Sequence, residues 1–266
     1  EITNVIGPDE YKDGVDNNAY TNYMAFFNVV LAKKYLPDIT KALEEKLDAE
    51  FGMEFTENKF NEFIAKIYLP KPNKDGIIPR FDGYENLEEI NLDKYKNKDK
   101  VGLIFKDYSF EEMQKIQVAK QADTIMLFYL LEDMFSKETI LKNFGYYEKR
   151  TCHDSSLSMC IHSLVEARNG DLKMADSMFE NSCSVDLGDK TNNSDAGIHA
   201  ASIGGIWLAF VMGYAGMRIK ENEISFSPVL PEGWKKYHFN ICFRGDIISV
   251  EVNRGACIVK GNSKTN

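Results

Sequence analysis

The sequence predicts a mainly helical protein that ends in a small antiparallel β-sheet. Apolar residues recur at helical spacing from residue 17 to about residue 214. After Gly216 the pattern changes to short β-type runs that are separated by Pro, Gly and Asn. A hydrophobic fraction of 44% in 266 residues is sufficient for a packed core. We therefore expect a helical domain over residues 1–216 and a β-sheet domain over residues 217–266.

We expect about seven or eight helices before the sheet. The first runs from residue 17 to Pro37, the second ends near Glu50, and the third covers residues 56–68. Residues 71–108 lack sustained periodicity, and connections of this length are usually functional or mobile. Helical patterns resume afterwards at 111–134, 136–147, 155–169, 171–184 and 197–214.

The later helices alternate in character. Residues 117–135 are apolar nearly all round, as expected of a helix that is buried on every side. Residues 136–147 are more mixed, the runs 155–169 and 197–214 are again apolar, and the run between those two is more polar. This alternation suggests an inner ring of helices that is wrapped by an outer ring.

Charge and cysteine content narrow the function classes. A formal net charge of −9, with no basic run, predicts no binding to nucleic acid or to anionic membranes and favours a small neutral substrate. The five cysteines are irregularly spaced, as is typical of reduced thiols in the cytoplasm. We find no leader pattern and no apolar run of about 18 residues, so we expect neither a signal peptide nor a membrane span.

Polar residues gather where helices are expected to begin. Helix N-termini carry free N–H donors and a positive dipole end, so parallel inner helices would form a mouth suited to an anion such as phosphate. Ordinary N-capping explains Asp16, Asn17 and Asp154 equally well. The clusters are "DEYKDGVDNN", "KQAD", "CHDSS" and "NNSDAGIHAAS".

Single residues refine this hypothesis. The four histidines lack close metal-ligand spacing, so we expect no zinc site; His162 and His238 are interpreted as structural, whereas His153 and His199 remain candidates. Gly204 and Gly205 each cost a helix about 1 kcal/mol relative to Ala, which the close approach of a ligand or a neighbouring helix would explain.

Nucleotide-binding and nucleophile-elbow motifs are absent from the sequence. Carboxylate chemistry remains. Glu10 is its best general-acid candidate, and phosphate is a candidate nucleophile.

Several motifs, in order over most of the chain, resemble glycoside hydrolase family 65, the family of the inverting maltose, trehalose, kojibiose and nigerose phosphorylases. The resemblance implies that the chain is the second half of an (α/α)6 barrel followed by a small antiparallel β-sheet domain. A missing N-terminal half of the same enzyme would then be its partner. The motifs are "GPDEYKDGVDNNAYTNYMA", "KQAD", "TCHDSSLS" (in which Cys152 interrupts the family wording), "AGIHAASIGGIW" and "SFSPVLPEGW".

The resemblance also implies residue roles. Glu10 matches the general acid, with Asp9 as a supporting acceptor, and Lys120 and Gln121 match the pair that holds the glucose unit. Phosphate is expected as a co-substrate, without a metal or an organic cofactor. Its binding residues would be His199, Ser202, Gly204, His153 and Ser155.

Alternatives stay open within and beyond this family. Hydrolytic acid trehalases share the fold and use water, although the cytoplasmic composition and the His199 cluster favour a phosphorylase. The isolated chain could instead be a non-catalytic fragment. The "DNNAYTN" wording favours the kojibiose, nigerose or trehalose type, and family phosphorylases are commonly homodimers.

Overall fold

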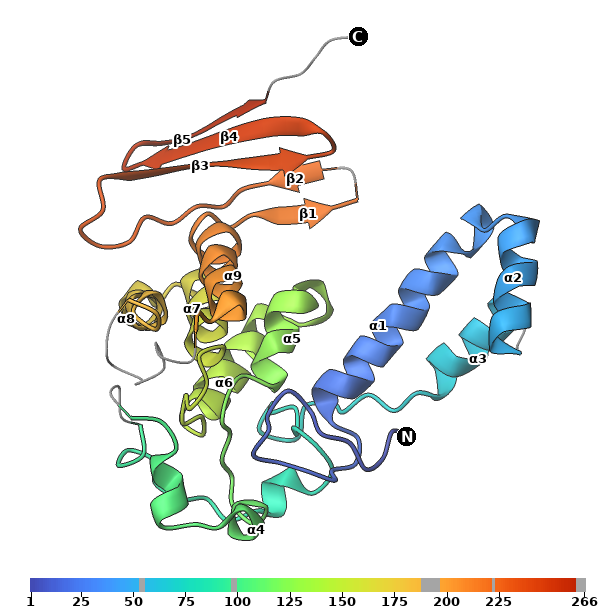
Figure 1. The fold of residues 1–266 in the computed structure, drawn as a ribbon, viewed down its shortest axis with the longest axis horizontal. Helices are drawn as coiled ribbons and strands as arrows, with labels where there is room; N and C mark the ends of the chain where they lie inside the picture. The colour runs from blue at the N-terminus through green and yellow to red at the C-terminus, as the bar shows by residue number, and fades with distance from the viewer. Residues whose placement is uncertain (53–55, 97–99, 188–196, 222, 262–266) are drawn as a thin grey trace. The chain divides into compact units, whose positions relative to one another are not determined.

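The computed structural model describes residues 1–52, 56–96, 100–187, 197–221 and 223–261 (Figure 1). The chain forms two compact units. Unit 1 contains Glu1–Asp93 and Ile104–Cys152, and unit 2 contains Lys94–Leu103 and His153–Asn266. Among the described helices, none combines the length and the apolar character that crossing a membrane requires. The predicted domain boundary between residues 216 and 217 stays a prediction.

Unit 1 contains six α-helices among its described residues. Helix α1 packs against α3 and α5, and α5 packs against α6. Asn18 is the N-cap of α1, because its Oδ1 accepts from the Thr21 N–H at 2.9 Å, so Asp16 and Asn17 do not have the capping role that was considered for them. The helices are α1 (Ala19–Tyr35), α2 (Lys41–Phe51), α3 (Glu57–Lys66), α4 (Phe110–Met113), α5 (Thr124–Leu130) and α6 (Lys137–Glu148).

The helix expected over residues 117–135 is much shorter in the structure. Only Thr124–Leu130 is α-helical, so "KQAD" precedes the helix and Asp123 occupies its N-cap position. The reason is long-range pairing: the Ala119 N–H donates to Arg150 O at 2.8 Å, and the Ala119 carbonyl accepts from the Cys152 N–H at 2.8 Å. These bonds use the backbone groups that a helix would need, so tertiary structure overrides the local pattern.

Residues 71–108 contain no α-helix in their described part, in agreement with the sequence. They form two 3-10 turns, Tyr84–Asn86 and Leu103–Lys106. Ile78, Arg80 and Tyr84 are nevertheless fully buried. In unit 1 the segment therefore supplies core side chains and is more than a surface connection.

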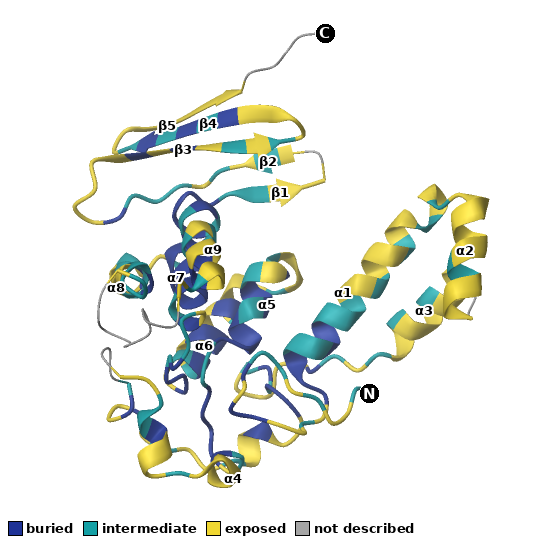
Figure 2. Cartoon of the chain, in the orientation of Figure 1, coloured by how far each residue is buried: buried dark blue, intermediate teal, exposed yellow. Residues whose placement is uncertain are grey.

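Unit 2 has three α-helices among its described residues, α7 (Ser158–Asn169), α8 (Leu172–Cys183) and α9 (Ala200–Leu208), and α9 continues as a π-helix over Ala209–Tyr214. Helix α7 packs against α8, α9 and the π-helix. Most of α7 is buried, whereas α8 is mainly of intermediate burial or exposed, which agrees with the expected alternation (Figure 2). Helix α9 departs from that expectation, because Ile203 and Trp207 are exposed.

In the part of the chain that the structure describes, five β-strands follow the π-helix. Strands β1 (Arg218–Lys220) and β2 (Glu223–Ser225) form one antiparallel pair. Strands β3 (Lys236–Phe243), β4 (Asp246–Asn253) and β5 (Ala256–Gly261) form a three-stranded antiparallel sheet in the order β3-β4-β5. Alternate residues of β4 face a core that includes Val211 and Ala215, so the sheet covers the end of the helical run (Figure 1).

Candidate active site

Two segments of unit 1 carry the predicted acid and sugar-binding residues, and Asp9 holds them together. Its Oδ1 accepts from the backbone N–H of Lys120 at 2.7 Å and of Tyr11 at 3.2 Å. The Asp9 N–H donates to Asp123 Oδ2 at 3.3 Å. Asp9 is fully buried, so these bonds are shielded from water. The supporting-acceptor role that the sequence predicted for Asp9 has a geometric basis here.

The Asp9 carboxylate also forms a buried ion pair. Arg80 Nη1 lies 2.7 Å from Asp9 Oδ2 and 3.2 Å from the Val118 carbonyl oxygen. The guanidinium carbon is 4.9 Å from the ring centre of Tyr84 and 5.4 Å from that of Tyr147. Burial raises the pKa of Asp9, and the Arg80 charge opposes that rise.

Glu10, Lys120 and Gln121 are brought together on this framework. Lys120 Nζ forms an ion pair with Glu10 Oε2, and the Glu10 side chain remains 59% exposed. Gln121 Nε2 donates to the Pro8 carbonyl at 2.6 Å. The predicted general acid and the predicted sugar-binding pair therefore lie side by side, with one carboxylate open to solvent.

A glycine permits this close packing. A Cβ on Gly7 would lie 2.4 Å from Asn18 Nδ2 and 2.6 Å from Asp123 Oδ2, so any larger residue would push the two segments apart. Asn18 Nδ2 donates to both oxygens of Asp123 at 3.3 Å. Burial raises the pKa of Asp123 to about 6, and Arg80 counteracts part of that effect.

Lys12, three residues after Asp9, is a second buried cationic residue of unit 1. Lys12 is buried, and its Nζ donates to the carbonyl oxygens of Met113 and, at 2.6 Å, of Ile116. Burial lowers the pKa of Lys12 to about 7; the Arg80 charge adds to the fall and Asp9 opposes it.

In unit 2, His153 and Ser155 lie in the irregular segment before α7. His153 has φ 59°, its Nδ1 is 2.8 Å from Ser158 Oγ, and its ring packs edge-on against His162. Ser155 Oγ accepts from the Leu157 N–H at 3.3 Å. The N-cap position of α7 belongs to Leu157.

Asp154 does not cap α7 either. Its Oδ1 accepts from the Gly102 N–H at 2.9 Å, so this carboxylate fixes a neighbouring loop of unit 2.

His199 and Ser202 mark the start of α9. His199 occupies the N-cap position without a side-chain cap; instead its Nδ1 is 2.6 Å from Asp186 Oδ1, and its N–H donates to Asp186 Oδ2 at 2.9 Å. The His199 bonds lower the pKa of Asp186. Ser202 Oγ donates to the carbonyl of Ser156, the residue that follows Ser155, at 3.0 Å.

The two glycines of α9 have different surroundings. A Cβ on Gly205 would lie 2.5 Å from Cys160 Sγ of α7, so the close approach of a neighbouring helix explains this glycine, as one of the two expected causes. A Cβ on Gly204 would meet nothing within 4 Å, and Gly204 is exposed. The structure offers no packing reason for Gly204.

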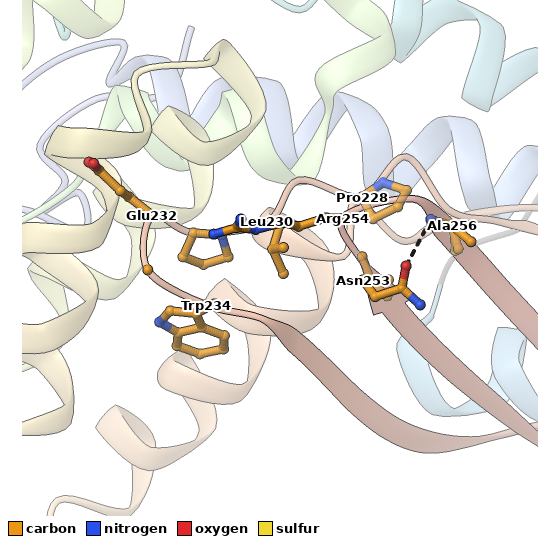
Figure 3. Close-up of a pocket in the computed structure, with 11 residues that line it drawn as sticks. Pro228, Leu230, Glu232, Trp234, Asn253, Arg254 and Ala256 are labelled. Carbon is orange, nitrogen blue, oxygen red and sulfur yellow. Dashed lines mark hydrogen bonds between the residues drawn. The ribbon is translucent and has the colours of Figure 1, made fainter.

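Unit 2 also has a cavity away from these residues. It encloses about 540 Å³, and its lining includes Leu230, Trp234 and Arg254 (Figure 3). Asn253 Oδ1 accepts from the Ala256 N–H at 3.0 Å at its edge. None of the predicted site residues is among those that line it.

Sequence reasoning missed two residues that hold predicted site residues in place, Arg80 in unit 1 and Asp186 in unit 2. Arg80 lies in the segment without periodicity, and nothing in its immediate sequence signals a buried ion pair. Asp186 precedes His199 by 13 residues and carries no local motif. Both are recognised only through contacts that are distant in sequence.

Comparison with known proteins gives the class first. Residues 1–208 match the "Glycosyl hydrolase family 65 central catalytic domain", and residues 217–265 match the "Glycosyl hydrolase family 65, C-terminal domain". The chain belongs to glycoside hydrolase family 65, as the resemblance of its motifs predicted. The mainly helical fold with a small antiparallel sheet agrees with part of an (α/α)6 barrel followed by a β domain.

Particular relatives are phosphorylases. The chain is 42% identical to the kojibiose phosphorylase of Halothermothrix orenii and 38% identical to that of Escherichia coli. Each match covers 95% of this chain. It is 37% identical to the alpha,alpha-trehalose phosphorylase of Geobacillus stearothermophilus over 95% of its length. The chain covers 33%, 32% and 33% of these three relatives, about a third of each.

A solved structure is also similar. It is that of a candidate kojibiose phosphorylase from the human microbiome, with a TM-score of 0.86 and 30% sequence identity. The match covers 98% of this chain and 36% of the solved one.

Proposed function

We propose that this chain carries the acid, sugar-binding and phosphate-binding residues of an inverting α-glucosyl disaccharide phosphorylase. The reaction cleaves an α-glucoside with phosphate and gives β-glucose 1-phosphate and a free sugar. The observation that carries the proposal is the contact between Glu10 and Lys120 on the Asp9 framework, in a chain whose relatives are phosphorylases.

Glu10 would act as the general acid. It protonates the glycosidic oxygen while the bond from that oxygen to the anomeric carbon breaks. A carboxylate in an ion pair must gain a proton before it can act as an acid. The glucose hydroxyls are therefore expected to draw Lys120 Nζ away from Glu10 when the substrate binds, with Gln121 as the second contact to the sugar.

Phosphate would attack the anomeric carbon from the opposite face. An inverting hydrolase needs a second carboxylate to activate water, whereas here a phosphate oxygen is the nucleophile. The N-terminal end of α9 supplies N–H donors and the positive end of its dipole. The phosphate-binding residues that we propose are His199, Ser202, Gly204, His153 and Ser155.

Kojibiose is the disaccharide that we propose to test first, followed by trehalose and nigerose. Kojibiose phosphorylases reach 42% and 38% identity, against 31% for the maltose phosphorylase of Bacillus subtilis. The activity belongs to the assembled enzyme, so the partner of this chain would be the part of the family enzyme that it does not contain.

The remaining properties of the enzyme are proposed with it. We place it in the cytoplasm and classify its reaction as glycosyl transfer to phosphate. All five cysteines are free thiols, as a reducing compartment favours. We propose that the enzyme works as a homodimer and without a metal or an organic cofactor.

The test is phosphate-dependent release of β-glucose 1-phosphate from kojibiose, trehalose, nigerose and maltose. Glu10→Gln keeps the size of the side chain and removes its acid, so kcat is expected to fall at least about a hundredfold. The matched control is Glu111→Gln, which removes another exposed carboxylate of unit 1 that pairs with a lysine, and it should leave kcat unchanged.

Other outcomes would identify the alternatives. Glucose release that does not need phosphate would indicate a hydrolase of the same family. Near-normal phosphorolysis by Glu10→Gln would show that Glu10 is not the acid.

A further inference from the structure

We infer that Arg80 is a positioning residue for the phosphorolysis site: through Asp9 it sets the geometry of Glu10 relative to Lys120. The inference rests on the proposed function and deepens it, because it assigns a role to a residue that no motif marked. Arg80 lies in residues 71–108, a segment whose lack of periodicity predicts a long connection between helices.

The guanidinium of Arg80 contacts both segments that carry the proposed site residues of unit 1. Arg80 Nη1 bonds Asp9 Oδ2 at 2.7 Å on one segment and Val118 O at 3.2 Å on the other. Glu10 directly follows Asp9, and Lys120 lies two residues after Val118. A single charged group therefore bridges the chain that carries the acid and the chain that carries the sugar-binding pair.

Asp9 connects Arg80 to the backbone on both sides of the site. Every hydrogen-bond partner of its carboxylate is a donor, namely Arg80 Nη1, the Lys120 N–H and the Tyr11 N–H. Tyr11 and Asp9 flank Glu10, so the backbone of Glu10 is fixed on both sides. Without the guanidinium, this buried carboxylate would keep two N–H donors and lose the stronger of the two positive charges that act on it, the weaker being that of Lys12.

The surrounding residues hold Arg80 in place. Its side chain is 2% exposed, and it lies against the rings of Tyr84 and Tyr147. Its carbonyl oxygen accepts from the Ala19 N–H at 2.7 Å, at the start of α1. A rigid anchor of this kind can hold a catalytic geometry, and a displacement of about 1 Å can reduce a rate about a hundredfold.

A purely structural role is the competing explanation. A buried ion pair is weak evidence for stability, because desolvation of the two charges offsets much of their attraction. Loss of Arg80 alone would nevertheless leave the Asp9 carboxylate buried without its bonded cation and destabilise the fold, so stability does not separate the two roles and a second readout is needed. What the pair adds is the fixed distance between the two segments at the site.

The experiment compares Arg80→Met and Arg80→Lys with Arg150→Met. Arg150 is a matched control in unit 1: it is buried, it lies against the ring of Tyr146, and it pairs with Glu89 away from Asp9. In the assembled enzyme we expect Arg80→Met to lower kcat about a hundredfold, with a smaller change in KM. Arg80→Lys should recover part of that loss, and Arg150→Met should lower thermal stability but leave kcat within about twofold.

A second readout does not depend on catalysis. On this chain alone, acylation of lysines by an N-hydroxysuccinimide acetate reagent is followed by peptide mass spectrometry, with exposed Lys115 as the internal reference. Arg80→Met should release Lys120 from its place beside Glu10 and speed its acylation several-fold, and Arg150→Met should not.

The outcomes separate the two proposals. If the unsubstituted enzyme shows no phosphorolysis, the proposed function fails, and acylation of Lys120 alone decides the role of Arg80. If Arg80→Met does not fold, Arg80→Lys takes its place in both measurements. Equal effects of the Arg80 and Arg150 variants on kcat, or on Lys120 acylation when kcat cannot be measured, would overturn the inference.

Discussion

Two buried ionisable residues near Glu10 in sequence or space, Lys12 and Asp123, make the free energy of unfolding of unit 1 depend on pH. Lys12 has a pKa of about 7 in the folded chain and an ordinary value of about 10.4 when unfolded. The unfolded chain therefore binds more protons between these values, and the free energy of unfolding rises as pH increases from 7 to 10. Asp123, with a folded pKa of about 6, acts in the opposite direction between about pH 4 and pH 6.

Lys12→Met should remove the rise in unfolding free energy between pH 7 and pH 10, which is on the order of a few kcal/mol. Chemical denaturation at a series of pH values measures it. Lys115→Met is the control, because Lys115 is exposed and its loss should leave the slope unchanged. A slope that persists in Lys12→Met would show that Lys12 is not its source.

Among the residues proposed to bind phosphate, His199 should depend on Asp186 for its orientation. Asp186 Oδ1 lies 2.6 Å from His199 Nδ1 and fixes the ring, so that Nε2 is the nitrogen left for a ligand. We expect Asp186→Ala to raise the KM for phosphate about tenfold, which corresponds to about 1.4 kcal/mol, with little change in the KM for the disaccharide.

Asp171→Ala is the matched control for Asp186→Ala. Asp171 also accepts a backbone N–H in unit 2, that of Met174 at 3.1 Å, but it caps α8 and has no contact with His199. Its loss should reduce stability by about 1 kcal/mol and leave the KM for phosphate unchanged. A rise in both KM values for Asp186→Ala would indicate general damage to unit 2.

At the scale of elements, the sequence predicted most helices and the type of the C-terminal sheet, because amphipathic periodicity and turn residues are local signals. It failed at residues 117–123, which are not helical and in which Ala119 forms an isolated β-bridge with Thr151. It also failed to find Arg80, whose role depends on Asp9, 71 residues away. Motifs therefore singled out Glu10 and Lys120 as candidates, and only tertiary contacts explain how these two residues are held.

The glycine pair of α9 permits an internal comparison within one helix. Gly205→Ala should destabilise unit 2 by about 1–3 kcal/mol, because its Cβ would lie 2.5 Å from Cys160 Sγ. Gly204→Ala meets open space and should stabilise α9 by up to about 1 kcal/mol. Thermal unfolding of both variants measures the difference.

Cys160→Ala combined with Gly205→Ala provides the decisive check of that clash. Removing Sγ should relieve the contact, so the double variant should lose less stability than the sum of the single variants. Strict additivity would mean that the two helices adjust without strain.

At the scale of the whole molecule, the chain spans about a third of its relatives and exposes apolar residues on its first helices. Phe27, Leu31 and Tyr35 recur at every fourth position of α1, so they form an apolar stripe on its surface. Stripes of this kind usually pack against another element. The part of the family enzyme that lies outside this chain is the partner that we expect there.

This chain alone is therefore expected to show no phosphorolysis and to bind an apolar dye. Adding a polypeptide that carries the other two thirds of the relatives' length should restore activity and reduce dye binding. Phe27→Gln combined with Leu31→Gln should prevent that recovery, whereas Ile247→Gln, at a comparably exposed position of β4, should not. Two results would contradict the idea that α1 binds the rest of the enzyme. One is phosphorolysis by this chain alone, and the other is full recovery of activity by the variant with Phe27→Gln and Leu31→Gln.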